Sequence, residues 1–395
     1  MRGSLSVKFC LLSFAIALVP FGASCNVQNE KGKLRSSVST KNSTPDTVEI
    51  ANNSNSPRES ITFILGEDKG TKNPYYAEAT NYYKYNKNGK TNYLVTTCRS
   101  LLEVRNHLVK EQPSNHLPWG VINLVSHGDQ WLGLSVKVTP QSKRSTLERV
   151  QDYLKKGTFK PLPDNIIDAQ SEIIIHACGV GNSPEFVTTM GKVFRGIHST
   201  PLVRAPVLFE YYSSIKQDST VQESQKYFAN AWITWYKRGQ KPTDSALFVN
   251  LQKKYPNSKI DWRDALKRAN PRWAGDVYHY AFDVPVISVI KLMNNDTAPD
   301  LSSDENKLAW INAQPEILKS LNNIQIPAEN FEWSTQIVYT PTRKGIKSPA
   351  MLVKGFCTIL CVLKPLTEES ENKLVLRNPF VPELDDSEYY YSLKQ

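Results

Sequence analysis

A histidine and a cysteine each follow an apolar segment of the kind that forms buried strands. His127 comes directly after residues 121–126, and Cys178 comes directly after residues 173–177. Such short, β-branched runs are typical of parallel strands that are covered on both faces. In open α/β sheets, ligands and reacting groups gather beyond the carboxyl ends of the strands. An imidazole near a thiol can take up its proton, so the two residues predict one cleft that holds a base and a nucleophile.

Glycines accompany both side chains. Gly128 follows the histidine, where a glycine permits a substrate to approach the backbone closely. Gly179 and Gly181 follow the cysteine and permit a tight turn out of the strand. Cys178 comes 51 residues after His127, which leaves room for a crossover helix and a hairpin. The alternative is that both residues merely end two strands and that the thiol is a small buried apolar group.

These residues resemble the motifs of the caspase-like cysteine peptidases, which include caspases, metacaspases, legumain, gingipain, clostripain, separase and the CHAT-domain proteases. The matches are His127-Gly128 and the segment Ala-Cys-Gly-Val-Gly at residues 177–181. Their separation is close to the roughly 50 residues between His and Cys in caspases. The resemblance extends over residues 59–285 as an order of strands and helices, and residues 270–273 are similar to the end of a CHAT domain. It does not favour one subfamily.

The resemblance implies a fold and a set of roles. The fold is an α/β fold with a caspase-like, parallel-rich sheet and helices on both faces. Cys178 would attack a peptide carbonyl, and His127 would protonate the departing amine. The backbone amides of Gly128 and Cys178 would form the oxyanion hole. The implied partner is a protein or peptide substrate, and no cofactor or metal is implied.

His176 departs from the family pattern, in which the residue two before the cysteine is commonly Asp, Ser, Glu or Gln. Because side chains alternate along a strand, His176 and Cys178 are expected to point to the same side. His176 is therefore an alternative base or a supporting partner of the cysteine. Together with His127 and Asp129, the two residues could also hold zinc in a metal-dependent hydrolase. No familiar ligand spacing supports that alternative.

Three acidic residues are candidates for the pocket that binds the residue before the scissile bond. Glu67 and Asp68 follow the first predicted strand, and Asp129 follows Gly128. Carboxylates at this edge would favour Lys or Arg in the substrate through charge pairing. The sequence favours the alternative that all three are solvated acids of loops.

The order of the other elements predicts the architecture. Strands alternate with helices up to about residue 209, and right-handed crossovers then imply a parallel sheet with helices on both faces. Residues 131–138 are predicted to add a hairpin. The predicted strands cover residues 60–66, 93–97, 121–126, 173–177 and 202–209, and the predicted helices cover residues 75–85, 101–110, 147–155, 184–194 and 222–238.

A smaller β-rich module is predicted for residues 286–395, after a peptidase domain of residues 59–285. The last part of the module, around residues 385–391, is predicted to be a frayed end rather than an extended segment in a cleft. The strand-like runs of the module cover residues 286–292, 335–339, 351–363 and 374–376, and they surround a helical stretch at residues 306–321 that Pro315 interrupts.

The first 24 residues have the features of a secretory signal, because Arg2 and Lys8 precede an apolar stretch at residues 9–21. Small residues lead to Cys25, which resembles the lipidated cysteine of a bacterial lipoprotein. We expect Cys25 to anchor the chain to a membrane, with ordinary cleavage and secretion as the alternative. Residues 25–58 are rich in Ser, Asn, Thr and Lys and are expected to be a flexible tether. The protein would then be an exported lipoprotein of the cell envelope, in the outer membrane or periplasm, or a secreted protein.

Composition argues against several other classes. The formal net charge of +10 is spread along the 395 residues without a zinc finger or an aromatic–basic repeat, so no nucleic-acid partner is expected. The sequence contains no Gly-x-Ser-x-Gly elbow, Walker loop or dinucleotide fingerprint. Cys98, Cys357 and Cys361 are expected in the core, which leaves Cys178 as the thiol without a structural explanation. A non-catalytic, surface-binding protein with the same fold is the alternative to a peptidase.

Overall fold

The computed structural model describes residues 58–70, 74–85, 92–217, 221–271, 276–292, 299–341, 347–367 and 379–393. The predicted signal at residues 1–24, the lipidation of Cys25, the tether up to residue 57 and the predicted strand at 374–376 lie outside the described residues. No helix in the described part of the chain is both long and apolar enough to cross a membrane.

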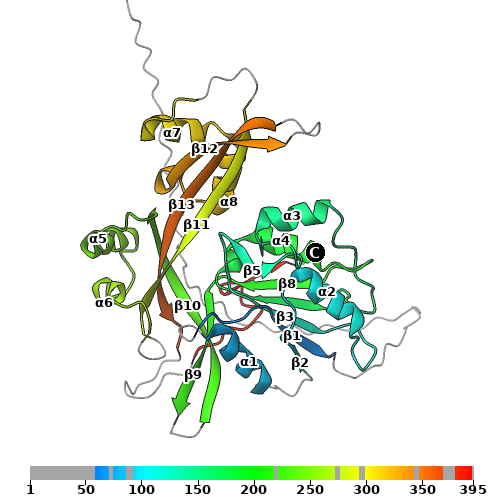
Figure 1. The fold of residues 1–395 in the computed structure, drawn as a ribbon. Coiled ribbons are helices and arrows are strands. Elements are labelled where there is room, and N and C mark those ends of the chain that lie inside the picture. Colours follow the sequence, from blue (N-terminus) through cyan, green and yellow to red (C-terminus); the bar gives the residue numbers. More distant parts are fainter. Residues whose placement is uncertain are drawn as a thin grey trace, which may run out of the picture. The chain divides into compact units, whose positions relative to one another are not determined.

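A six-stranded sheet carries the two segments that the sequence singles out (Figure 1). Its order from edge to edge is β2, β1, β3, β7, β8 and β14. All neighbouring pairs are parallel except the last, because β14 runs antiparallel to β8. This confirms the predicted α/β class with a mostly parallel sheet. The strands are β1 (Ser60–Ile64), β2 (Asn92–Val95), β3 (Val121–Val125), β7 (Glu172–His176), β8 (Leu202–Pro206) and β14 (Tyr390–Leu393).

Helices cover both faces of this sheet because its strands are apolar on both sides. Ile64 and Val125 pack in one cluster with α1, whereas Phe63 and Leu124, which alternate with them along the strands, pack with α2, α3 and α4. Ser100 caps α2 by accepting the N–H of Glu103, as the helix-start rules lead one to expect. The helices are α1 (Tyr75–Tyr85), α2 (Leu101–Lys110), α3 (Leu147–Lys155) and α4 (Pro184–Val193).

A small antiparallel sheet follows His127 directly. It consists of β4 (Gly128–Asp129), β5 (Gly133–Lys137) and β6 (Arg144–Ser145), in that order across the sheet. Gly128 pairs with Leu134, so the chain reverses at once after the histidine. Residues 131–138, predicted to add a hairpin, contain one strand, β5, and its hairpin partners β4 and β6 lie before and after that range.

A second, antiparallel sheet contains the longest strands of the described chain (Figure 1). The strand β13 pairs with β11 along one side, and along its other side it pairs first with β12 and then with β10. The strand β9 continues the sheet beyond β10. These strands are β9 (Phe209–Gln217), β10 (Val221–Lys237), β11 (Tyr278–Lys291), β12 (Glu332–Pro341) and β13 (Lys347–Pro365).

Both faces of β13 are covered because its apolar residues run in succession. Leu360 and Val362 pack in a cluster with α5 and α6, while Ile359 and Cys361 pack in a larger cluster with α7 and α8. This explains why Cys357 and Cys361 are buried, as predicted. The break at Pro315 is also confirmed, since Pro315 begins α8. The helices are α5 (Asp244–Lys254), α6 (Trp262–Leu266), α7 (Asp304–Asn312) and α8 (Pro315–Ile324).

Two predicted elements are wrong. Residues 222–238, predicted as an amphipathic helix, lie in the strand β10. Tyr227, Ala231, Trp232 and Trp235 suit one face of a helix. Three of them, Tyr227, Ala231 and Trp235, are four residues apart, and every fourth residue also lies on one face of a strand. The predicted strand at 202–209 is divided between β8 and β9, which belong to different sheets.

The predicted division at residue 285 falls inside β11. Strands β9 and β10 come from the predicted peptidase domain, yet β10 pairs with β13 from the predicted C-terminal module. The prediction of a frayed end around residues 385–391 is wrong for Tyr390 and Tyr391, because these residues begin the edge strand β14. Tyr390 is only 2% exposed and its ring lies 5.9 Å from that of Phe228, in an edge-on arrangement.

We predict that Tyr390→Ala lowers the free energy of unfolding by about 3 kcal/mol, because it empties a buried aromatic site between β14 and β10. The measurement is urea denaturation followed by fluorescence. Tyr339→Ala is the matched control, since Tyr339 is 67% exposed and its loss should change the free energy by less than about 0.5 kcal/mol. Equal effects of the two substitutions would contradict a structural role for the C-terminal strand.

Candidate functional site

His127 and Cys178 lie at the same edge of the parallel sheet. In the pairing of β3 with β7, Val125 lies opposite His176, and the N–H of Ser126 donates to the carbonyl of His176 at 3.1 Å. His127 and Cys178 are each two residues beyond this matched pair. The segments also touch further on, because a Cβ on Gly128 would lie 3.1 Å from the Cβ of Ala177. The two strands that the sequence predicts to be neighbours are neighbours.

The imidazole of His127 is held by two tyrosines at the start of α1. The ring of Tyr75 stacks on it with centroids 4.2 Å apart, and the ring of Tyr76 meets it edge-on at 4.8 Å. The hydroxyl of Tyr76 also accepts the backbone N–H of His127 at 3.0 Å. Burial lowers the pKa of His127, with Asp68 opposing the shift and Arg144 adding to it. The imidazole is therefore neutral at neutral pH and can accept a proton.

The thiol of Cys178 is half-buried and hydrogen-bonded to the backbone. It donates to the carbonyl oxygen of Glu210 at 3.2 Å, and it packs against the apolar cluster of the antiparallel sheet. Burial raises the pKa of Cys178 to about 12. The resting thiol is therefore protonated, and the sulfur needs a base before it can act as a nucleophile.

The glycines after Cys178 allow the sharp turn that the sequence predicts. Gly179 has a φ of 62°, in the left-handed region that favours glycine, and its N–H donates to the carbonyl of Leu208 at 2.8 Å. A Cβ on Gly181 would lie 2.5 Å from the carbonyl oxygen of Ala205. After β7, the chain therefore packs closely against the backbone of β8 and of the segment that follows β8.

His176 lies in a buried polar network. Its Nδ1 is 2.9 Å from the Glu210 carboxylate, and its Nε2 is 3.0 Å from Oδ1 of Asn123. The side chain is 2% exposed, and its ring meets that of Tyr83 edge-on. Burial lowers the pKa of His176, and Glu210 opposes this. Both ring nitrogens are occupied, which favours a structural role over that of an alternative base.

Glu210 is the charged centre of this network. Besides His176 it accepts the hydroxyl of Tyr212 at 2.7 Å, and the buried Lys226 lies near enough to act on its charge. Burial by itself raises the pKa of Glu210, but His176, Lys226 and the hydrogen bonds outweigh it and lower the pKa to about 2. The same residue holds the Cys178 thiol through its carbonyl.

The three acids predicted for the substrate pocket all have partners within the fold. Glu67 is exposed and forms an ion pair with Arg99. Asp68 accepts the N–H groups of Tyr76 and Ala77 at the start of α1. These two residues therefore fit the alternative of loop acids with local partners.

Asp129 is the most buried of these three acids, with 8% of its surface exposed. It accepts the N–H groups of Trp131 at 3.0 Å and Leu132 at 2.7 Å, and Arg144 lies 3.7 Å away. Burial raises the pKa of Asp129 to about 6, against the effects of Arg144 and the two amides. Its carboxylate shapes the turn between β4 and β5, and its charge adds to the rise in the pKa of the Cys178 thiol that burial causes.

The metal-site alternative does not gain support from this geometry. Among the residues that the structure describes, no three His, Cys, Asp or Glu side chains are grouped so that they could hold a metal ion. Of the proposed ligands, His176 and Asp129 use their donor atoms on the contacts given above.

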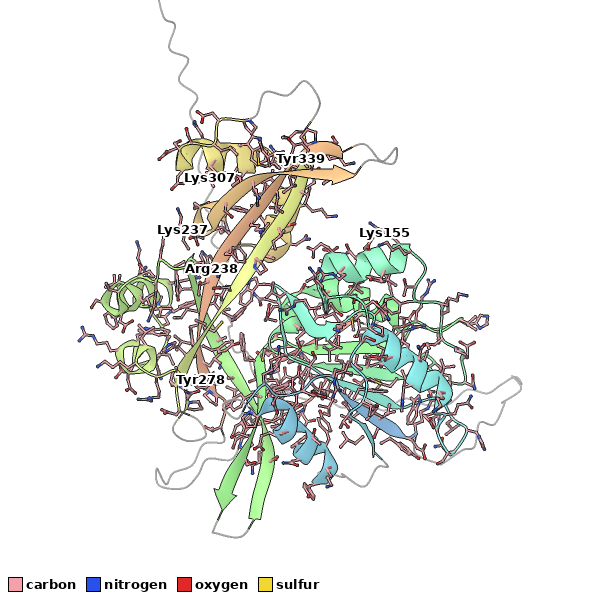
Figure 2. The ribbon with its side chains drawn as sticks, viewed as in Figure 1. Lys155, Lys237, Arg238, Tyr278, Lys307 and Tyr339 are labelled. Atoms are coloured by element: carbon pink, nitrogen blue, oxygen red, sulfur yellow. The ribbon has the colours of Figure 1, made fainter. Side chains whose placement is uncertain are left out.

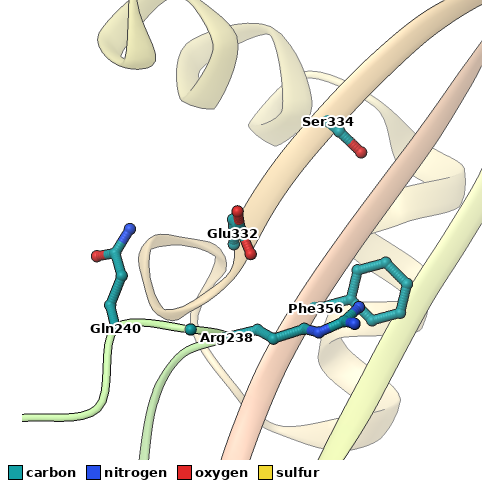
Figure 3. A pocket seen from close by; sticks show the side chains of 6 residues that line it. Arg238, Gln240, Glu332, Ser334 and Phe356 are labelled. Atoms are coloured by element: carbon teal, nitrogen blue, oxygen red, sulfur yellow. The ribbon is translucent and has the colours of Figure 1, made fainter.

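A surface pocket of about 460 Å³ lies elsewhere, where the end of β10 meets β12 and β13 (Figure 3). The guanidinium of Arg238 lies over the ring of Phe356 at 4.5 Å and is 3.2 Å from Asp283. None of the residues predicted for the site lines this pocket. Its lining residues are Arg238, Gly239, Gln240, Glu332, Ser334 and Phe356.

The sequence did not reveal Tyr75, Tyr76 and Glu210 as residues of the site. The signal that the sequence offers for the two tyrosines is that the helix predicted at residues 75–85 is rich in tyrosine. Nothing in that pattern indicates which histidine they contact. Comparison with known proteins adds no family: no protein-family model, curated protein or solved structure matches the chain.

We predict that alkylation of Cys178 by iodoacetamide accelerates about tenfold per pH unit between pH 7 and pH 9. A thiol with a pKa raised to about 12 gains thiolate in proportion to hydroxide over that range. The rate is measured by mass spectrometry of the peptide that contains Cys178. A plateau already reached at pH 7 would instead indicate a preformed thiolate–imidazolium pair.

We predict that Glu210→Gln lowers the free energy of unfolding at pH 7 by on the order of 3 kcal/mol, because it removes the buried carboxylate whose charge offsets that of the buried Lys226. The pKa of Glu210 is about 2 in the folded protein, below the 4.5 of an ordinary glutamate. Its stabilisation is therefore complete above about pH 4.5 and is lost as the pH falls towards 2.

The difference between wild type and Glu210→Gln should accordingly shrink over that acidic range, as followed by urea denaturation at a series of pH values. Glu388→Gln is the control, since Glu388 is exposed. A difference that stays constant from pH 7 to pH 2.5 would contradict an ionised, buried Glu210.

Proposed function

We propose that this chain is a cysteine endopeptidase of the caspase-like type, in which Cys178 is the nucleophile and His127 the general acid–base. The observation that carries the proposal is the register of β3 with β7. Val125 is paired with His176, so the two reactive residues follow two adjacent parallel strands by the same number of positions. Carboxyl ends of parallel strands are where reacting groups gather in such sheets.

The protonation states suggest the order of events. The neutral imidazole of His127 takes the proton of the Cys178 thiol as the sulfur attacks the carbonyl carbon of the peptide bond. The carbonyl oxygen becomes an oxyanion near the amides of Gly128 and Cys178. The imidazolium then donates its proton to the nitrogen as the C–N bond breaks and the amine departs. Water, deprotonated by His127, hydrolyses the thioester and regenerates the thiol.

The topology gives the proposal further support. The five parallel strands have the order β2, β1, β3, β7 and β8, which corresponds to the 2-1-3-4-5 order of doubly wound sheets. In that order the ligand crevice lies at the point where the direction of winding reverses, next to the first and third strands. His127 lies two residues beyond the end of β3, which is the third strand in this order. The caspase-like resemblance of the motifs is in keeping with such a sheet.

The place of action is part of the same proposal. The signal-like residues 1–24 and Cys25 would direct the chain out of the cytoplasm and attach it to a membrane, with residues 25–58 as the tether. The substrates would then be proteins or peptides of the cell envelope or of the surroundings.

A non-catalytic binding protein is the second candidate, and one observation favours it. The Cys178 thiol already has a hydrogen-bond acceptor in the Glu210 carbonyl, and burial raises its pKa to about 12. A thiol in such surroundings can be a structural group. A test of function must therefore separate the reactive role of Cys178 from its packing.

We predict that Cys178→Ala abolishes cleavage of a diverse peptide library by the full chain and that His127→Ala lowers the rate on the order of 10²–10⁴-fold. The products are identified by mass spectrometry, and circular dichroism checks that both variants remain folded.

Matched controls are available in the same chain. Cys98→Ala removes a buried thiol and His198→Ala an exposed imidazole, and neither should slow cleavage. The proposal is rejected if the folded wild-type protein cleaves no peptide, or if Cys178→Ala cleaves as fast as wild type.

A further inference from the structure

Three alternate residues at the start of β11 form an aromatic face on the antiparallel sheet. Tyr278, Tyr280 and Phe282 are two residues apart and therefore lie on the same side of the strand. The rings of Tyr280 and Phe282 have centroids 5.6 Å apart and are tilted by 31°. Figure 2 shows Tyr278 at its position on β11. These three side chains are called the aromatic face below.

The aromatic face belongs to the same side of the sheet as residues packed around Cys178. Tyr280 pairs with Cys361 across β11 and β13, and directly paired residues point to one side. Cys361 is buried in the apolar cluster against which Cys178, Tyr278 and Phe282 all pack. Tyr278 and Tyr280 also lie near enough to Cys178 for a charge on its sulfur to raise the pKa of both phenols, with burial as the larger cause, so the aromatic face is near the candidate nucleophile.

The aromatic face also meets the segment that follows His127. The ring of Trp131, in the turn between β4 and β5, lies 5.7 Å from that of Phe282. The ring of Tyr211, one residue after the Glu210 that holds the thiol, lies 6.5 Å from that of Tyr278. The aromatic face therefore borders the chain on both the histidine and the cysteine sides of the site.

This face retains accessible apolar surface. Tyr280 is 51% exposed, and Tyr278 and Phe282 are half-buried. Covering such surface with another apolar side chain is favourable in proportion to the area removed from water. Aromatic partners add the preference of rings for tilted or offset contact. The chemical match is a large apolar or aromatic side chain.

Charge at this place gives no comparable preference for a basic side chain. Asp129 is the nearest of the acids once expected there, and its oxygens accept the N–H groups of Trp131 and Leu132. Arg144 already lies 3.7 Å from the same carboxylate. Asp129 is thus already engaged with the turn and with Arg144, in keeping with the alternative of loop acids that the sequence favours.

We propose that the aromatic face is a substrate subsite of the peptidase proposed above, and that it takes a large apolar or aromatic side chain next to the scissile bond. This inference rests on the proposed function, because the subsite has a role only if Cys178 attacks peptides. It deepens that function by naming the substrate class.

The test uses four peptidyl acyloxymethyl ketones that differ only in the residue beside the reactive ketone, which is Phe, Leu, Lys or Asp. The rate of covalent modification of Cys178 in the full chain is measured by mass spectrometry. The Phe and Leu probes should react at least about tenfold faster than the Lys and Asp probes. Tyr280→Ala should slow the Phe probe roughly tenfold and leave the Lys probe unchanged.

Two variants serve as controls. Tyr280→Phe keeps the ring and should keep the rate with the Phe probe. Tyr339→Ala removes an exposed aromatic residue near the far end of β13, and it should change no rate. Faster reaction with the Lys or Asp probe, or an equal effect of Tyr280→Ala on all four probes, would overturn the subsite and leave the peptidase standing. If no probe modifies Cys178 while iodoacetamide does, both proposals fall.

Discussion

Glu210 lies at the start of β9, where the chain leaves the parallel sheet for the antiparallel one, and its buried carboxylate binds His176 of β7. The same carboxylate also accepts the hydroxyl of Tyr212 and interacts with the charge of Lys226 of β10. A buried carboxylate is costly unless charges and donors surround it, so this network fixes how the two sheets join. The carbonyl of the same residue accepts the Cys178 thiol. The residue that carries the buried charge thus also contributes a hydrogen bond to the sulfur, in addition to the strand register that brings Cys178 to this edge of the sheet.

The opposite wall of the site is neutral and aromatic. Tyr75 and Tyr76 enclose His127, and burial lowers the pKa of the imidazole while it raises that of the Cys178 thiol. Both shifts act against charge separation, so the resting pair is uncharged. In the proposed mechanism, charge would develop only as the thiol attacks a carbonyl and backbone amides stabilise the oxyanion. Such an arrangement protects the thiol from incidental alkylation and oxidation, since the thiolate is the reactive form.

Local signals made part of this fold predictable. Short β-branched runs ending in His127 and Cys178 identified two strands, and the glycines at 179 and 181 identified the turn. The residues that hold the reactive groups were not predictable, because Tyr75, Tyr76 and Glu210 reach the site only through tertiary packing. Likewise, no pattern in the sequence predicts that the side chain of Asp68 accepts the first N–H groups of α1. The strand β10 was mistaken for a helix because a four-residue repeat of apolar residues fits either structure when both faces are covered.

The antiparallel sheet joins parts of the chain that the sequence seemed to separate. Strand β13 pairs with β10 from before residue 238 and with β11 and β12 from after residue 277. The aromatic face on β11 exists only when this pairing is complete, because Cys361 and Ile359 support it from β13. The reactive pair, by contrast, is set by the local register of β3 and β7. Reactivity and selectivity would therefore arise from different pairings, and a competent site requires that residues nearly two hundred positions apart fold together.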